Sequence, residues 1–149
     1  FSTGSISNSI FNYSGNDGID VSGTLLNLRD IKMTEIGDKA ISIGEKSSLV
    51  ADGIDIKGAV LGLVSKDRSD AVAKNVIFED ILGTAIMTYV KKIEYGPSRL
   101  ECEECIFNGD MSYTGSQAGT VIKLNGKNIP GGTLTRKQMT DSGLIEQEV

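Results

Sequence analysis

The sequence of 149 residues contains no histidine and no tryptophan. Without histidine the chain cannot form a Ser-His-Asp triad, a histidine general base or a histidine-ligated metal site. It also lacks a run of 18 apolar residues, so no helix is expected to span a membrane. The formal charge of −5 and the pI near 4.7 argue against non-specific nucleic-acid binding, which needs a basic surface.

Cysteine is scarce, with only Cys102 and Cys105 in the chain. Two cysteines are too few for a disulfide scaffold, and no further cysteine or histidine can complete a four-ligand zinc site. A redox Cys-x-x-Cys motif usually begins a helix, whereas this pair is followed by the strand-like Ile106 and Phe107. We therefore interpret the pair as two small thiols in the core, and leave open whether they are bonded to each other.

What the chain does contain is a repeat. One column of triplets, exemplified by Ile31-Lys32-Met33 and Val76-Ile77-Phe78, begins at positions 9, 31, 54, 76 and 105, in steps of 22, 23, 22 and 29. Two further columns keep the same period to within one residue. They are Ile6, Leu28, Val50, Ala73 and Cys102, and Gly18, Ala40, Gly62 and Ala85. Three columns that agree on one period indicate a repeat architecture.

Each repeat holds three short apolar segments, often alternating, as in Ile41-Ser42-Ile43, and separated by turn-forming residues. This pattern predicts an all-β fold, a right-handed parallel β-helix with about 22 residues per coil. The leucine-rich repeat has a suitable length, but its motif is missing. Equivalent side chains should then stack in interior ladders. One such ladder is Phe11, Met33, Ile56, Phe78 and Phe107.

The predicted organisation is four coils and part of a fifth over residues 1–124, followed by a C-terminal cap over residues 125–149. We expect the cap to place a short helix over the last coil; the alternative is a disordered tail. The step of 29 reflects an insertion at residues 91–98, which should leave the coil on one face.

The repeat is already under way at Ile6, with no capping element before it. This favours a fragment of a longer protein, with further coils or another domain at the N-terminal end. An open edge also invites edge-to-edge association, so a homo-oligomer is a second expectation.

Over about residues 5–124 the chain resembles the right-handed β-helix proteins of the pectate-lyase-like superfamily. Residues 37–47, 65–69 and 89–92 resemble, more narrowly, the β-helix module of bacterial surface or secreted proteins, some of which carry a CotH-kinase-like domain. The resemblance implies an extracellular or cell-surface location and the binding or cleavage of acidic polysaccharides. It does not fix an activity, because folds of this kind host many functions.

Charged residues follow two neighbouring strands. Lys66, Asp67 and Arg68 lie about one coil before Lys91 and Lys92, since 91 − 66 = 25, so these side chains should be side by side. The resemblance implies lyase chemistry on uronates, in which a lysine removes a proton or neutralises the sugar carboxylate. The alternative is a solvated, self-neutralising ladder of turns.

If the protein is an enzyme, the expected catalytic residues are Lys66, Asp67, Lys91 and Lys92. The expected substrate contacts are Arg68, Tyr89 and Tyr95, the tyrosines as stacking platforms for sugar. Asp17, Asp20 and Asp38 occupy equivalent turns and have the oxygen chemistry that Ca²⁺ needs. Aspartate in such turns more often bonds its own backbone, so we predict no metal or other cofactor.

Three functions remain open from the sequence. The first is a β-helix module of a larger bacterial surface or secreted protein that binds polysaccharide. The second is a polysaccharide lyase or epimerase acting on uronates. The third is a structural spacer or oligomerisation element without a site.

Overall fold

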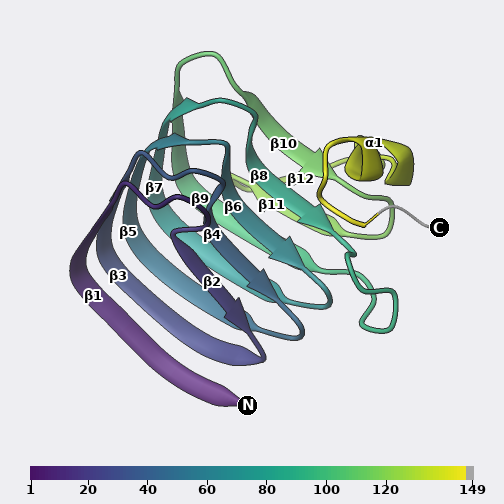
Figure 1. Ribbon diagram of the computed structural model, residues 1–149, viewed down its shortest axis with the longest axis horizontal. Coiled ribbons are helices and arrows are strands. Elements are labelled where there is room, and N and C mark those ends of the chain that lie inside the picture. Colours follow the sequence, from purple (N-terminus) through teal and green to yellow (C-terminus); the bar gives the residue numbers. More distant parts are fainter. Residues whose placement is uncertain (147–149) are drawn as a thin grey trace.

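The computed structural model describes residues 1–146 and shows a parallel β-helix of about six turns (Figure 1). A long-strand sheet forms two sides of each coil. In spatial order its strands are β1 (Ser2–Asn12), β3 (Thr24–Thr34), β5 (Ser48–Ala59), β7 (Asp70–Ile81), β9 (Arg99–Asn108), β11 (Val121–Leu124) and β12 (Lys127–Ile129). A short-strand sheet forms the third side. Its strands are β10 (Ser112–Ser116), β8 (Thr84–Tyr89), β6 (Leu61–Lys66), β4 (Lys39–Gly44) and β2 (Ile19–Ser22).

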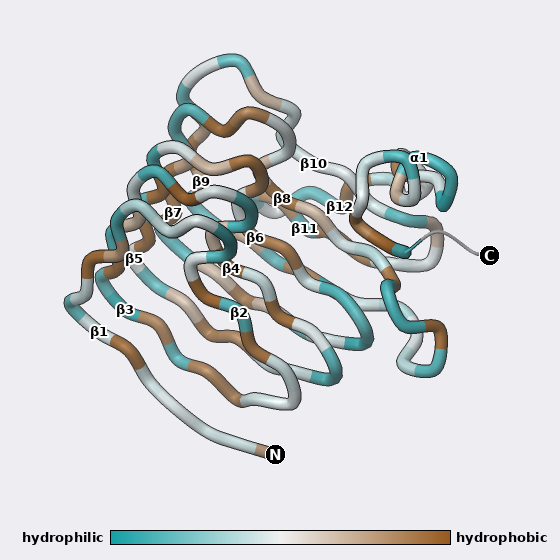
Figure 2. The backbone as a smooth tube through the Cα atoms, viewed as in Figure 1, coloured by the Kyte–Doolittle hydropathy of each residue, from teal (hydrophilic) through white to brown (hydrophobic). Residues whose placement is uncertain are grey.

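The register of the long strands confirms the predicted interior ladder. Phe11 pairs with Met33, Met33 with Ile56, Ile56 with Phe78, and Phe78 with Phe107. Figure 2 shows the apolar segments recurring at matching places in successive coils. One assignment in the second column is wrong: Leu28 pairs with Ala51, not Val50, whose side chain points outward and is 57 % exposed.

The long strands bend because each contains a residue with positive φ. This column is Asn8, Asp30, Gly53, Asn75 and Glu104, and it repeats in step with the ladders. The bend shifts the inward–outward alternation by one residue. In β3, for example, Leu28 and Ile31 on either side of Asp30 are both buried. Each long strand therefore lines the core with both of its arms.

The C-terminal end differs from the prediction in two ways. The parallel stack continues to a sixth layer, because β11 pairs with β9, although the repeat pattern fades after Asn108. The helix α1 (Arg136–Asp141) does not lie over the last coil. Its Met139, together with Ile145, packs on the outer face of the short-strand sheet. There it shields the apolar side chains of Val64 and Tyr89 from solvent. Residues 147–149 of the predicted cap lie outside the described residues.

Helix α1 begins with a capping box. Thr135 Oγ1 accepts a hydrogen bond from the Gln138 backbone N–H (3.2 Å), and Gln138 Oε1 accepts one from the Thr135 N–H (2.8 Å). These bonds satisfy backbone donors that a helix start leaves free. Within residues 1–146, no helix has both the length and the apolar character that crossing a membrane requires.

The cysteines are core residues, as predicted, but they are not thiols. Cys102 and Cys105 form a disulfide and are 0 % and 5 % exposed. They occupy the two inward positions that flank the bend of β9, where β7 has Ala73 and Val76. Because the bend turns both positions inward, a spacing of three residues brings the two side chains together.

The short-strand sheet contains positions that admit only small residues. A Cβ at Gly62 would lie 2.3 Å from the Ala85 carbonyl oxygen and 2.7 Å from Phe78 Cε1. Successive coils place Gly18, Ala40, Gly62 and Ala85 there, which leaves room for the large side chains of the facing ladder.

We expect Gly62→Ala to lower the free energy of unfolding by about 1–3 kcal/mol, because the added methyl group overpacks the core. Gly15→Ala is the matched control, since a Cβ there meets no atom within 4 Å. Chemical denaturation of both variants measures the difference. Equal stability of the two would contradict the close packing at Gly62.

Candidate functional site

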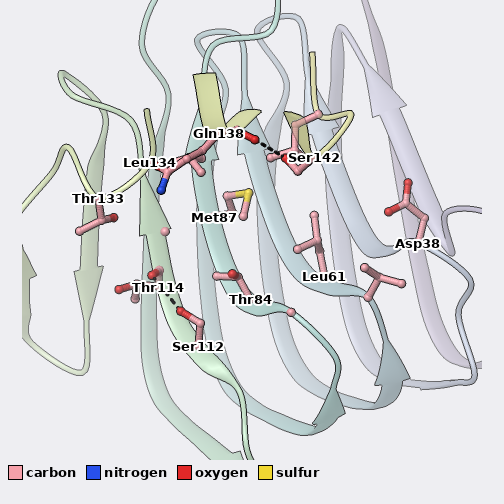
Figure 3. Close-up of a pocket in the computed structure, with 14 residues that line it drawn as sticks. Asp38, Leu61, Thr84, Met87, Ser112, Thr114, Thr133, Leu134, Gln138 and Ser142 are labelled. Carbon is pink, nitrogen blue, oxygen red and sulfur yellow. Dashed lines mark hydrogen bonds between the residues drawn. The ribbon is translucent and has the colours of Figure 1, made fainter. Parts of the chain in front are cut away.

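A hollow of about 490 Å³ lies between the short-strand sheet and the C-terminal segment (Figure 3). Leu61, Thr84 and Met87 reach into it from β6 and β8, and Thr114 from β10. Leu134, Gln138 and Ser142 face them from the opposite wall. We call this hollow the cap groove. It exists because α1 covers only part of the sheet's outer face.

The lining of the cap groove is apolar and hydroxylic. Its polar groups are those of Thr84, Ser112, Thr114, Thr133, Gln138 and Ser142. Asp38 supplies the one carboxylate among the residues that line it, and none of them is a lysine or an arginine. Asp38 also pairs with Lys39 Nζ at 3.0 Å. The groove therefore suits a ligand that carries hydroxyl groups and no negative charge.

Asp67 directly follows the C-terminal end of β6, and its role there is structural. Its side chain is buried, and Oδ1 accepts hydrogen bonds from the backbone N–H groups of Lys91 and Lys92, each at 2.7 Å. Asp67 and Arg68 both have positive φ and form the tight turn between β6 and β7. The predicted neighbours are thus brought together, but the contact is between a carboxylate and backbone, and it anchors the start of the insertion.

The three candidate lysines have different surroundings. Lys92 is exposed and forms an ion pair with Glu45, and this hydrogen bond raises the pKa of Lys92. Burial lowers the pKa of Lys66, although the nearby Asp20 opposes the shift. Lys91 and Arg68 are exposed. None of Lys66, Arg68, Lys91 and Lys92 lines the cap groove.

The two candidate tyrosines lie outside the groove. Tyr89 is completely buried in the apolar cluster with Met139 and Ile145, so its ring is not an open platform for sugar. Burial also raises the pKa of Tyr89 well above its usual range, and its hydroxyl has no hydrogen-bond partner within the described chain. Tyr95 is half-buried in the insertion.

The three aspartates considered as Ca²⁺ ligands have different surroundings. Asp17 Oδ1 accepts a hydrogen bond from the Lys39 backbone N–H at 3.1 Å, while burial raises the pKa of Asp17. Asp38 pairs with Lys39, and Asp20 is exposed. Across the described residues, no group of three or more acidic or cysteine side chains is placed to hold a metal ion.

Sequence reasoning did not find the cap groove. Its far wall comes from residues 133–144, which follow the last recognisable repeat. One signal was present: Leu61, Val64, Met87 and Tyr89 make the strands β6 and β8 apolar on their outer side as well. A strand with two apolar faces is covered on both, so a segment packed against this sheet could have been expected.

The fold defines the chain as a parallel β-helix protein. No protein-family model matches it, and neither the curated proteins nor the solved structures contain a match. The comparisons therefore lend no support to the pectate-lyase-like or CotH-associated resemblance.

If Asp67 anchors the insertion, Asp67→Gly should increase hydrogen exchange at the Lys91 and Lys92 amides and lower the free energy of unfolding by about 2–3 kcal/mol. Glycine tolerates the positive φ of this position, so the substitution adds no backbone strain, and exchange at the Lys91 and Lys92 amides reports the loss of the hydrogen bonds. Asp67→Asn, which keeps an acceptor oxygen, should have a smaller effect. Unchanged protection in Asp67→Gly would show that the carboxylate does not hold the loop.

Proposed function

We propose that the protein is a non-catalytic β-helix module of a larger secreted or cell-surface bacterial protein, and that it binds a neutral polysaccharide in the cap groove. The observation that carries the proposal is the composition of the groove. Hydroxyl groups and the Gln138 amide line it together with apolar side chains, and no lysine or arginine is among the lining residues. Sugar rings offer both hydroxyl groups and apolar C–H faces, so the two surfaces match in chemistry.

The same composition weighs against the second hypothesis, a lyase or epimerase acting on uronates. Such an enzyme must neutralise a sugar carboxylate beside the reacting carbon, and no lysine or arginine is among the residues that line this groove, whose one carboxylate, Asp38, is paired with Lys39. The candidate basic residues Lys66, Arg68, Lys91 and Lys92 lie after the C-terminal ends of β6 and β8 or at the end of β6 itself. There the Asp67 carboxylate accepts hydrogen bonds from backbone N–H groups, and Lys92 forms an ion pair with Glu45.

The disulfide supports a secreted location. Disulfides persist in oxidising compartments and are rare in reducing ones. The Cys102–Cys105 bond is buried, which shields it from thiols in the folded protein.

The third hypothesis, a structural spacer, needs no ligand at all. Both this hypothesis and the first one assume the same stack of coils. They differ only in whether the cap groove binds a ligand. Ligand binding therefore separates the two.

We expect linear neutral oligosaccharides to shift the amide resonances of Thr84, Thr114 and Gln138, and uronate oligomers of the same length to leave them unchanged. Gly115→Leu should abolish the shifts by filling the groove. A Cβ at Gly115 lies 3.6 Å from both Met87 Cε and Thr84 Cγ2, so the fold can accept a side chain there. Gly15→Leu, at an open surface position, is the matched control.

Two results would overturn the proposal. An absence of shifts with every neutral oligosaccharide would leave the spacer as the better account. An unsaturated, ultraviolet-absorbing product formed from uronate polymers would instead favour the lyase.

A further inference from the structure

The disulfide spans a bend whose residue differs from those of the other coils. Glu104 lies between Cys102 and Cys105 and has a φ of 53°. The bends of the other long strands have asparagine, aspartate or glycine at this place, namely Asn8, Asp30, Gly53 and Asn75. Those residue types adopt positive φ most readily, whereas glutamate has neither the freedom of glycine nor a short polar side chain that bonds the local backbone. Of the five bends, that of β9 therefore has the least suitable residue.

The bend of β9 also has less support from neighbouring strands. An interior bend lies between the equivalent bends of two adjacent strands, as Gly53 does between Asp30 and Asn75. β9 pairs with β7 on both sides of its bend, but β11 pairs only with Arg99–Cys102, which precede the bend. Within residues 1–146, no parallel strand therefore stacks on Cys105–Asn108 from the C-terminal side.

The side chain of Asn125 bonds the backbone at the place where that strand would lie. Asn125 Oδ1 accepts a hydrogen bond from the Cys105 backbone N–H (2.9 Å), and Asn125 Nδ2 donates one to the Cys105 carbonyl oxygen (3.0 Å). The Asn125 backbone N–H donates to the Cys102 carbonyl oxygen (2.8 Å). Asn125 thus contacts both ends of the bend, and directly after it β12 folds back on β11 as a hairpin. These bonds require the bend, because it orients the Cys105 backbone relative to that of Cys102.

The position of the disulfide indicates that it acts on this bend. A disulfide is thought to stabilise a fold mainly by constraining the unfolded chain, and that effect is smallest for short loops. Here only Glu103 and Glu104 lie between the two cysteines. The bond limits the backbone of these two residues to conformations in which the cysteine side chains meet. In β9 the side chains meet because the bend turns both of them inward.

We infer that the Cys102–Cys105 disulfide is a conformational clamp, which keeps Glu104 in the left-handed conformation and so lets Asn125 close the C-terminal end of the stack. At this coil the covalent bond has the role that asparagine, aspartate or glycine has at the other bends. Loss of the bond should therefore loosen the hairpin β11–β12 more than it loosens the interior coils.

The clamp can be removed and then replaced by a better bend residue. Cys102→Ala with Cys105→Val gives β9 the residues that β7 has at the paired positions, Ala73 and Val76. In this double variant, hydrogen exchange at the backbone amides of residues 105 and 125 should be at least about tenfold faster than in the unmodified protein. Adding Glu104→Asn should restore most of the protection. Glu104 is exposed, so this third substitution leaves the core unchanged.

Glu35→Asn, added to the same double variant, is the matched control. Glu35 is also an exposed glutamate with positive φ (54°), but it follows β3, which lies three strands from β9 in the sheet. Effects of distant substitutions add, so Glu35→Asn should restore no protection at residues 105 and 125.

Two exchange results would overturn the inference: unchanged protection after the disulfide is removed, or equal exchange of the double variant with and without Glu104→Asn. Circular dichroism covers the case in which the double variant does not fold. Recovery of the fold by Glu104→Asn, and not by Glu35→Asn, would support the clamp. Failure of all three disulfide-free variants to fold would contradict it, because the disulfide would then do more than hold the bend.

Discussion

The structure depends on the vertical stacking of interior side chains, and that stacking depends on the bend in each long strand. A straight strand of 11 or 12 residues would present one face to the core and leave the coil open. The column of positive φ at Asn8, Asp30, Gly53, Asn75 and Glu104 turns both arms inward. Asparagine, aspartate and glycine adopt this conformation most readily, and they fill four of the five positions. Parallel hydrogen bonding then repeats the bend in every coil.

The outward-facing residues of the two sheets differ in how far they are exposed to solvent. Along the long-strand sheet the outward positions are mostly exposed, as Val50 and Ile77 show. Along the short-strand sheet, Val64 and Tyr89 are buried from outside by the C-terminal segment. That cover is incomplete, and the uncovered part is the cap groove. The groove is thus a consequence of how a terminal segment packs on a sheet with two apolar faces.

The parts of the fold that repeat could be predicted from the sequence, because each ladder is sampled several times. The period, the parallel architecture and the ladder from Phe11 to Phe107 were all readable in this way. The error of one residue at Val50 arose because the 23-residue step of the second column was placed one coil too late, whereas the first column has it between Ile31 and Ile54, in the same coil as Leu28 and Ala51. The period alone could not decide whether Cys102 and Cys105 are bonded, since it is the bend that turns both side chains inward.

The candidate site was less predictable. The proximity of Asp67 to Lys91 and Lys92 followed from the period, but a spacing does not reveal that the carboxylate contacts backbone rather than side chains. Tyr89 was expected on the surface, and its burial depends on Met139 and Ile145, some 50 residues later in the chain and outside any repeat. Features formed by unique segments left no recurring signal.

The most direct test of the account is a nuclear Overhauser experiment on methyl-labelled protein. The stacked register predicts contacts between the methyl groups of Met33 and Ile56 and between those of Ile31 and Ile54, which pair in neighbouring strands. Absence of both contacts, or contacts that place Met33 beside the outward residues of β5, would contradict the stacking on which the fold and the cap groove both rest.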